Sequence, residues 1–598
     1  MRRVRVALLA AAFALLAGAA SPLAAQTGST RFIPTFLIYY GGGPNLVSTD
    51  APKLAKFDLI DIDRFRYYDF GPNAWAAIKS LNPNVQIYLY EDGAEASNFD
   101  DGTAQVYLNN LGRYDVSRGH SMGSLNGNHP ELFLVDAQGN RVYNTGYANP
   151  IATQHLYLMD FGSAAYQSYW LEAVNADIVS QLWIADGVFA DNCPTINVTN
   201  FGVYSGVPVR YPDDAGWSAA MNSFAAAITS GLHGRGQKLW CNRGETRFPN
   251  GSNAWLQLDG STSPPDVLLE EGAFAVIWGS PTWAVQFYPE ADWKRQVDTL
   301  AAIRISRVAM LSHTKLLPDP GADTGTDNLG KLVTYWQTLW YSLGSFLLGK
   351  NDILGNAYFM FAGGGGYDRI WWHDEYDKID LGKAIGPYAV MSIASTNGAT
   401  NVYWREFEKG HVYVNPTPGD VPSMPLLQPG RRLTHDNLNS PPDSIPIVGA
   451  IALSGHNAAI VLKTTATRYQ EDDAAVNGSP AAAWGRRGPE VAAFSGGTAG
   501  SSNVAGATGT FAFMGTAVSW IGLKCNVCGI ATLSVDGGPA TSVDTAGAAA
   551  PGSPGLASEA VFTASGLAAG AHSVVITVTG TTTSGGAHVV VDAFDVTP

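Results

Sequence analysis

The stretch Gly187-Val188-Phe189-Ala190-Asp191-Asn192 is a short apolar run that ends on a carboxylate, and it decides the fold. A second stretch, Asp266-Val267-Leu268-Leu269-Glu270-Glu271, repeats this design. When the two stretches are aligned, Asp191 falls on Glu271. Such runs predict strands of a parallel sheet, and the carboxyl ends of parallel strands meet at one edge.

Eight runs of this kind alternate with segments of helical pattern. They are Thr35–Tyr40, Leu59–Asp63, Val85–Tyr90, Gly187–Asp191, Lys238–Asn242, Val267–Glu271, Val308–His313 and Ala357–Ala362. The last predicted helix covers Leu329–Leu348. Eight strand–helix units predict an α/β fold, a closed (β/α)8 TIM barrel over residues 31–395.

The chain that follows the barrel has no helical pattern. Residues 403–415 predict a hairpin around Lys409-Gly410, part of a small antiparallel β-sheet over residues 396–465. From residue 466 the chain is rich in Ala, Gly, Ser, Thr and Val, with short strand-like runs between turn signals. This pattern predicts a C-terminal β-sandwich over residues 466–598.

Composition and charge exclude several classes of function. The 598 residues carry a formal charge of −15, and no basic run follows residue 6, so no nucleic-acid partner is expected. Residues 1–25 have the positive start and apolar core of a secretory signal peptide. No later segment is long and uncharged enough to insert into a membrane, so we expect a secreted chain, periplasmic or extracellular. The oligomeric state stays open.

The four cysteines fall into two pairs. Cys193 and Cys241 end neighbouring predicted strands, which predicts a disulfide between them in an exported chain. Cys525 and Cys528 form a lone CxxC, which predicts a local disulfide or free thiols, since zinc would need two further ligands.

Asp191 and Glu271 are the candidate catalytic residues. A carboxylate at the C-terminal end of a barrel strand typically belongs to the active site. Strict alternation along the strands selects Glu271 over Glu270, but a bulge would reverse that choice, so Glu270 stays a candidate. Two carboxylates across a cleft are the usual means of breaking a glycosidic bond, so the expected partner is a carbohydrate.

Other polar residues at strand ends are candidates for substrate binding, because carboxylate, amide and phenol groups hydrogen-bond sugar hydroxyls. They are Tyr40, Asp61, Asp63, Glu91, Asn242 and His313. No His/Glu pair has the spacing of a catalytic zinc site, and no metal or cofactor is expected.

Two other functions compete with the glycosidase. Gly119-His120-Ser121-Met122-Gly123 matches the nucleophile elbow of serine esterases, but its flanks predict neither the strand nor the helix that this motif needs. A degenerate barrel that binds carbohydrate without cleaving it would hold one of the two candidate acids in an internal salt bridge.

Three segments resemble a family of bacterial glycoside hydrolases, the hypothetical glycosyl-hydrolase-like family 15. They are residues 186–192, 268–272 and 405–416, and the similarity covers roughly residues 31–465. The resemblance implies a TIM barrel that acts on carbohydrate, with Asp191 and Glu271 as its acids. The C-terminal part is similar to β-sandwich modules of secreted bacterial enzymes, many of which bind sugars, through residues such as 518–522 and 591–594.

Overall fold

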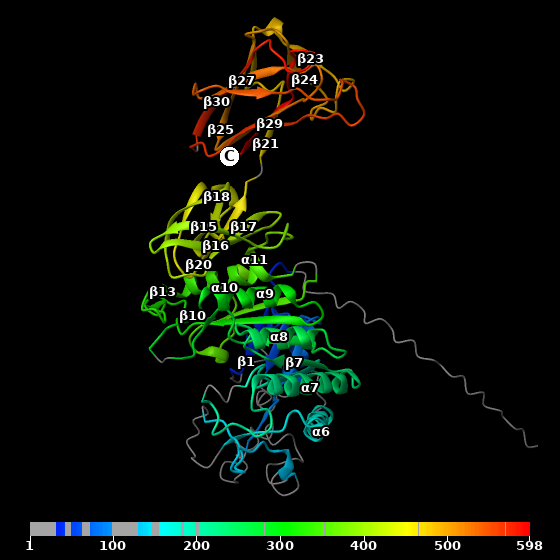
Figure 1. Cartoon of the computed structure of the whole chain (residues 1–598), viewed down its shortest axis with the longest axis vertical. Coiled ribbons are helices and arrows are strands. Elements are labelled where there is room, and N and C mark those ends of the chain that lie inside the picture. Colours follow the sequence, from blue (N-terminus) through cyan, green and yellow to red (C-terminus); the bar gives the residue numbers. More distant parts are fainter. Residues whose placement is uncertain are drawn as a thin grey trace, which may run out of the picture.

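The computed structural model describes residues 31–41, 49–62, 72–97, 129–145, 155–180, 185–197, 202–279, 282–351, 354–464, 466–568 and 570–597. The predicted signal peptide, Asp63 and the Ser121 motif lie outside these residues. In Figure 1 the helix-containing part, the small sheet and the C-terminal domain follow one another along the long axis of the molecule.

The predicted TIM barrel is confirmed. Eight parallel strands form one sheet, in the order β1 (Phe36–Tyr39), β2 (Leu59–Ile62), β3 (Gln86–Asp92), β6 (Gly187–Asp191), β7 (Lys238–Asn242), β8 (Val267–Glu270), β11 (Arg307–His313) and β14 (Ala357–Ala362). A parallel bridge between Thr35 and Phe359 joins the first strand to the last and closes the sheet.

Helices cover the outside of the barrel. They are α1 (Ala51–Leu54), α3 (Pro72–Leu81), α6 (Ala164–Ser180), α7 (Asp214–His233), α8 (Pro249–Asp259), α9 (Glu290–Ala302), α10 (Tyr335–Gly349) and α11 (Glu375–Lys378). Asp213 caps α7 by accepting a hydrogen bond from Gly216 N at 2.7 Å, and the Thr334 hydroxyl accepts from Gln337 N at 3.0 Å at the start of α10.

The predicted start of the last barrel helix at Leu329 is wrong, because α10 begins at Tyr335. Residues Leu332–Thr334 form β13, which pairs with β12 (Thr324–Thr326).

Short antiparallel strand pairs lie at the mouth of the barrel. Strand β4 (Glu95–Ser97) pairs with β5 (Leu156–Leu158), and β9 (Ala275–Val276) pairs with β10 (Gln286–Phe287).

The six-stranded small sheet has the order β15 (Ala389–Ser395), β16 (Gly398–Glu406), β17 (Gly410–Asn415), β20 (Asn457–Lys463), β18 (Val421–Leu433) and β19 (Ile447–Leu453). The pairing of β16 with β17 confirms the predicted hairpin. The sheet already includes β15, which precedes the predicted boundary at residue 396; the domain limits stay a prediction.

Helix α10 joins the barrel to the small sheet. Its residues are buried on nearly every side, and Val412, Val414 and Ala458 of the sheet belong to the same apolar core. A side chain at Gly344 would meet the Ala458 Cβ at 2.4 Å, so the helix and the sheet approach closely there.

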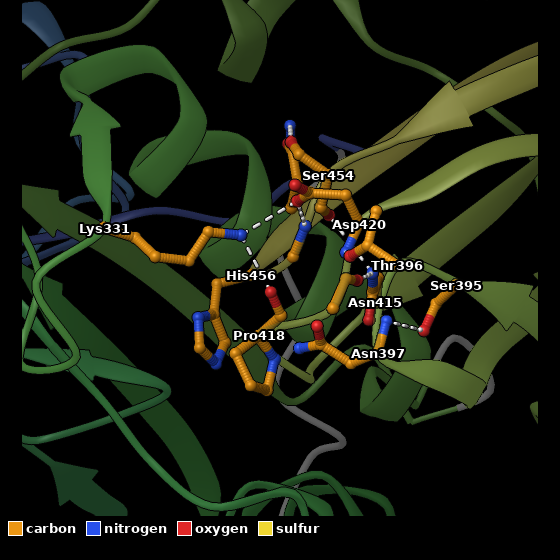
Figure 2. Close-up of polar contacts among 12 residues, drawn as sticks. Lys331, Ser395, Thr396, Asn397, Asn415, Pro418, Asp420, Ser454 and His456 are labelled. Carbon is orange, nitrogen blue, oxygen red and sulfur yellow. Dashed lines mark hydrogen bonds and ion pairs between the residues drawn. The ribbon is translucent and has the colours of Figure 1, made fainter.

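A polar contact adds to this interface. Lys331, in the β12–β13 turn, donates to Asp420 Oδ1 at 2.9 Å and to Pro418 O at 2.8 Å in the small sheet (Figure 2). Asp420 also accepts from Gly455 N at 2.8 Å. The barrel and the small sheet therefore share an apolar core and a charged contact.

The C-terminal domain is the predicted β-sandwich. The first of its three antiparallel sheets contains β21 (Thr467–Gln470), β32 (Ala593–Thr597), β26 (Ala517–Gly522) and β29 (Glu559–Ala564). The second contains β22 (Val476–Ser479), β25 (Thr508–Gly515), β30 (Gly570–Val578), β27 (Ile530–Val535) and β28 (Thr541–Asp544). The third contains β23 (Gly485–Arg487), β24 (Ala499–Ser502) and β31 (Val589–Val591). Side chains such as Phe511, Trp520 and Phe594 fill one core between the sheets.

The cysteines correct one prediction and confirm another. Cys525 and Cys528 form the local disulfide, but Cys193 and Cys241 are free, buried thiols, which contradicts the bond predicted between them. The Cys193 thiol is directed at the carbonyl oxygens of Ala190 and Asp191, at 3.7 and 3.5 Å. Its pKa is raised by burial and by a hydrogen bond to Cys241, so the two thiols are neighbours without a covalent bond.

None of the helices in the described part of the chain is long and apolar enough to span a membrane.

Candidate active site

Asp191 and Glu271 lie at the carboxyl ends of the fourth and sixth barrel strands, and Asn242 at the end of the fifth lies between them. The Asn242 side-chain nitrogen donates to Asp191 Oδ1 at 2.8 Å and to Glu271 Oε2 at 2.6 Å. Both oxygens contact one nitrogen atom, so they are no further apart than 5.4 Å, the sum of those two lengths. The structure therefore brings the two candidate acids together through a third predicted site residue.

Each acid also accepts a hydrogen bond from a tyrosine. Tyr90 OH donates to Asp191 Oδ2 at 2.7 Å, and Tyr367 OH donates to Glu271 Oε1 at 2.5 Å. The Asn192 backbone N–H gives Asp191 one more donor at 2.8 Å, where Asn192 adopts a left-handed φ of 53°. All four carboxylate oxygens of the pair thus have a hydrogen-bond donor.

The pKa of both acids is raised. Burial is the main cause for each, and the charge of Glu271 raises the pKa of Asp191 further. The charge of Glu270 adds to the rise at Glu271, whereas the tyrosine and asparagine donors oppose it. Two neighbouring buried carboxyls resist carrying two charges, so the pair favours a form with one proton.

Tyr40 completes a cluster of rings around the pair. Its ring lies edge-on to Tyr90 at 5.5 Å and to Tyr367 at 5.4 Å, and its hydroxyl donates to Asp61 Oδ2 at 3.0 Å. Asp61 is fully buried and therefore acts through Tyr40. We call Tyr40, Tyr90 and Tyr367, with Asp61, the tyrosine cluster. It lies toward the first, second, third and eighth strands.

The remaining predicted site residues are His313, Glu91 and Asp63. His313 contacts the Glu271 carbonyl oxygen through Nε2 at 2.8 Å, and burial lowers its pKa to about 4, so it is neutral. Alternation along β3 turns the buried Glu91 away from the face that carries Tyr90. Asp63 lies outside the described residues.

Glu270, the reserve candidate, has a different environment from its neighbour. It is 3% exposed and accepts from Thr246 N at 2.7 Å and from Thr246 Oγ1 at 2.5 Å. It thereby holds the loop after β7 in place, and no hydrogen bond recorded among the described residues joins it to Asp191.

Tyr90 and Tyr367 were not among the predicted site residues. Tyr90 stands beside Glu91 at the end of a predicted strand, where alternation could have selected it. Tyr367 follows the glycine run after β14 and reaches the site because Tyr40 N and Gly41 N donate to its carbonyl oxygen, at 2.8 and 3.1 Å. The only feature of the sequence that pointed to Tyr367 was its position just after the eighth strand.

The sequence matches the model of a known protein family. The model of the family described as Hypothetical glycosyl hydrolase family 15 matches residues 79–411, more than half of the sequence, and the chain belongs to that family. The chain is accordingly a carbohydrate-active enzyme of the glycoside hydrolase class. No curated protein matches it.

Several solved structures are similar at low identity. A cycloisomaltooligosaccharide glucanotransferase from Paenibacillus sp. is 8% identical with a TM-score of 0.28, and the match covers 95% of this chain and 58% of that one. The maltogenic alpha-amylase AmyB from Thermotoga neapolitana is 8% identical (TM-score 0.35, 72% of this chain, 96% of that one). The alpha-galactosidase AgaA from Geobacillus stearothermophilus is 10% identical (TM-score 0.35, 72% and 55%). The chain thus spans just over half the length of the glucanotransferase and the galactosidase.

Proposed function

We propose that the chain hydrolyses glycosidic bonds with Asp191 and Glu271 and retains the configuration of the anomeric carbon. The shared Asn242 donor is the observation that carries this proposal, because it limits the nearest carboxylate oxygens to 5.4 Å. Retaining glycosidases hold their carboxyl groups about 5–5.5 Å apart, whereas inverting enzymes need about 6.5–9.5 Å to admit water between them.

In this proposal Asp191 is the nucleophile. Its three donors, Tyr90, Asn242 and the backbone N–H of Asn192, favour the ionised carboxylate that attacks the anomeric carbon. The bond to the leaving oxygen breaks as the bond to Asp191 forms. The tyrosine cluster then surrounds the sugar that becomes attached to the enzyme.

Glu271 is the general acid and base. It lines a cavity of about 420 Å³ beside the pair, from which a leaving group would depart. Its proton goes to the leaving oxygen in the first step. In the second step Glu271 takes a proton from water, the water oxygen bonds to the anomeric carbon, and Asp191 is released.

The rival function of a carbohydrate-binding protein without catalysis is less well supported. That function would hold one acid in a salt bridge, but within the described ranges neither Asp191 nor Glu271 forms an ion pair with lysine or arginine. Export of the chain is a further proposal, which rests on the signal-peptide pattern of residues 1–25 and is tested by N-terminal sequencing of protein recovered outside the cytoplasm.

A polysaccharide panel and a covalent trap together test the function. Soluble starch, dextran, pullulan, xylan, mannan and chitosan would be incubated with the wild type, and released reducing ends measured. The 2-deoxy-2-fluoroglycosyl fluoride of the cleaved sugar should then add its glycosyl mass to the peptide that contains Asp191. Labelling of a peptide with Glu271 instead would exchange the two roles, and labelling of neither would contradict a covalent mechanism.

A further inference from the structure

A cavity of about 420 Å³ opens on one side of the catalytic pair. Glu271 and Asn242 line it, but Asp191 does not. The remaining walls come from the segment that follows the third barrel strand, which supplies Asn144, and from the loops that follow the fourth, fifth and sixth strands. These loops supply Asn192, Glu245, Arg247 and Trp278, among others. Its size lies within the range of small-ligand pockets, about 300–1,000 Å³. The tyrosine cluster is absent from this lining, so the pair separates two different regions.

Trp278 forms an apolar wall of this cavity. It is 48% exposed, more than any other tryptophan among the described residues, most of which are buried. A side chain at Gly272 would meet Trp278 Cζ3 at 2.8 Å, so the indole lies against the backbone one residue after Glu271. His313 flanks the same ring at a centroid distance of 5.6 Å. A large flat ring is thus held next to the proposed acid with much of its surface free.

Two charged side chains lie in the same lining. Arg247 Nε is 3.6 Å from Glu245 Oε2, and its guanidinium lies 5.0 Å from the centre of the Tyr288 ring. Glu245 adopts a left-handed φ of 69°, uncommon for a residue with a long side chain. Glu245 Oε2 is buried, and its charged partner is the Arg247 guanidinium. The pair therefore offers a fork of donors and a carboxylate, held in a strained loop.

We propose that this cavity binds the sugar ring on the leaving-group side of the bond that is cleaved, with the apolar face of the ring on Trp278 and its hydroxyls bound by Glu245 and Arg247. This inference rests on the proposed roles of Asp191 and Glu271. A neutral pyranose fits better than an acidic sugar, because three acids, Glu245, Glu270 and Glu271, line the cavity against two arginines, Arg243 and Arg247. Of the two arginines, Arg247 is already paired with Glu245.

A leaving-group site is also an acceptor site. Once the sugar is attached to Asp191, a hydroxyl of a pyranose bound over Trp278 can attack the anomeric carbon in place of water. The new glycosidic bond forms, the bond to Asp191 breaks, and the hydroxyl proton passes to Glu271. The enzyme should therefore transfer glycosyl groups to an acceptor sugar as well as to water. Only transfer to the sugar uses the cavity, so the ratio of transfer to hydrolysis reports on the cavity alone.

The α- and β-fluorides of glucose, galactose, mannose and xylose serve as donors, because fluoride departs without needing a sugar in the cavity. The acceptor is p-nitrophenyl β-glucoside, and products are measured as transferred and hydrolysed sugar by mass spectrometry. Trp278→Ala should lower the transfer-to-hydrolysis ratio by roughly tenfold, as for loss of a central aromatic contact, and Trp278→Phe should restore most of it. Glu245→Gln and Arg247→Gln should lower the ratio by a smaller factor.

Trp283→Ala is the matched control, because Trp283 belongs to the same loop but does not line the cavity, and its ratio should equal that of the wild type. An unchanged ratio in Trp278→Ala would overturn the subsite while leaving the catalytic pair intact. Faster transfer to p-nitrophenyl β-glucuronide than to the glucoside would overturn the preference for a neutral ring. Failure of the wild type to turn over any fluoride would contradict the carboxylate pair, and the subsite with it.

Discussion

Buried carboxylates occur both at the mouth of the barrel and in the C-terminal sandwich, but their partners differ. In the sandwich, Asp592 is fully buried and accepts hydrogen bonds from Ser495 and from the Ser558 hydroxyl. At the barrel mouth, Asp191 and Glu271 share a single asparagine donor, burial raises the pKa of both, and the charge of Glu271 raises the pKa of Asp191 further. The sandwich uses its buried acid to hold loops together, whereas the barrel keeps two acids close together, each with a raised pKa.

Other acids in the two regions show the same contrast. In the sandwich, Arg468 forms a two-point contact with Asp595 at 2.7 Å for each bond, and a hydrogen bond from His572 lowers the pKa of Asp536. At the barrel mouth, burial raises the pKa of Glu95 and of Glu245 to about 7 each. Raised pKa values of clustered acids are typical of catalytic sites, and lowered values of paired acids are typical of structural ones.

The largest expected effect is loss of catalysis at the barrel mouth. Asp191→Asn and Glu271→Gln keep the side-chain shape but remove the nucleophile or the acid. Each should cut the turnover number at least about a hundredfold, since acid–base assistance alone contributes about 10²–10⁴-fold. Glu270→Gln is the matched neighbour and should do far less. Steady-state rates, with thermal unfolding as a folding control, check this, and a near-wild-type rate for Asp191→Asn would end the mechanism.

Removal of the shared donor tests the coupling of the two acids. Asn242→Ala should lower the rate roughly tenfold to a hundredfold, because a hydrogen bond to a charged group contributes about 1.5–3 kcal/mol. The donor lowers the pKa of both acids, so its loss should move the alkaline limb of the pH–rate profile to higher pH. Asn250→Ala, which removes a surface asparagine–Asp214 contact, is the control. An unmoved profile would show that Asn242 does not bridge the pair.

The buried acid of the sandwich should behave in the opposite way. Asp592→Asn places an amide group against the Ser495 N–H and leaves a buried donor poorly paired. We expect the free energy of unfolding of the sandwich to fall by about 1–3 kcal/mol. Hydrolysis of small glycosides should keep its wild-type rate. Urea unfolding followed beside activity measures both, and a loss of turnover at unchanged stability would remove the contrast between the regions.

The pH dependence of stability sharpens the comparison further. Glu95 is 1% exposed with a folded pKa of about 7, against an ordinary value near 4.5. Between those values the unfolded chain releases this proton while the folded chain keeps it, so stability falls as pH rises toward 7 and is greatest below 4.5. The loss due to Glu95 is on the order of 1–3 kcal/mol. Unfolding of Glu95→Gln at pH 5.5 and 8 should show a flatter dependence than the wild type, and an equal slope would contradict the raised pKa.

The smallest effect is expected from removal of the sandwich. A chain that ends at residue 464 keeps the barrel, α10 and the small sheet with its Lys331–Asp420 contact. It should hydrolyse small soluble glycosides at the wild-type rate. If that shortened chain folds by circular dichroism yet loses activity, the sandwich contributes to the active site.

Periodicity predicted the barrel because each strand is a nearly continuous apolar run, buried on both faces, that ends in polar residues. The same local rule identified Asp191, Asn242 and Glu271, which all lie at strand ends. It failed at Leu329, where residues 332–334 pair with β12, because short exposed strands carry little hydrophobic pattern.

Contacts that depend on the path of a loop could not be predicted from the sequence. Tyr367 reaches Glu271 through the turn after β14, and Trp278 reaches the cavity through the loop after β9; neither path has a local signal. The thiols of Cys193 and Cys241 lie close together as predicted, yet their bonding state depends on side-chain direction, which strand positions do not define.

The anomeric configuration of the first product distinguishes a retaining enzyme from an inverting one. Proton NMR would follow hydrolysis of the best substrate from the first turnovers, before the free sugar equilibrates between its anomers. Because the oxygens of Asp191 and Glu271 that accept from Asn242 lie no further apart than 5.4 Å, we expect the first sugar released to have the anomeric configuration of the substrate. Release of the opposite anomer would show that water attacks directly and would contradict the assignment of Asp191 as nucleophile.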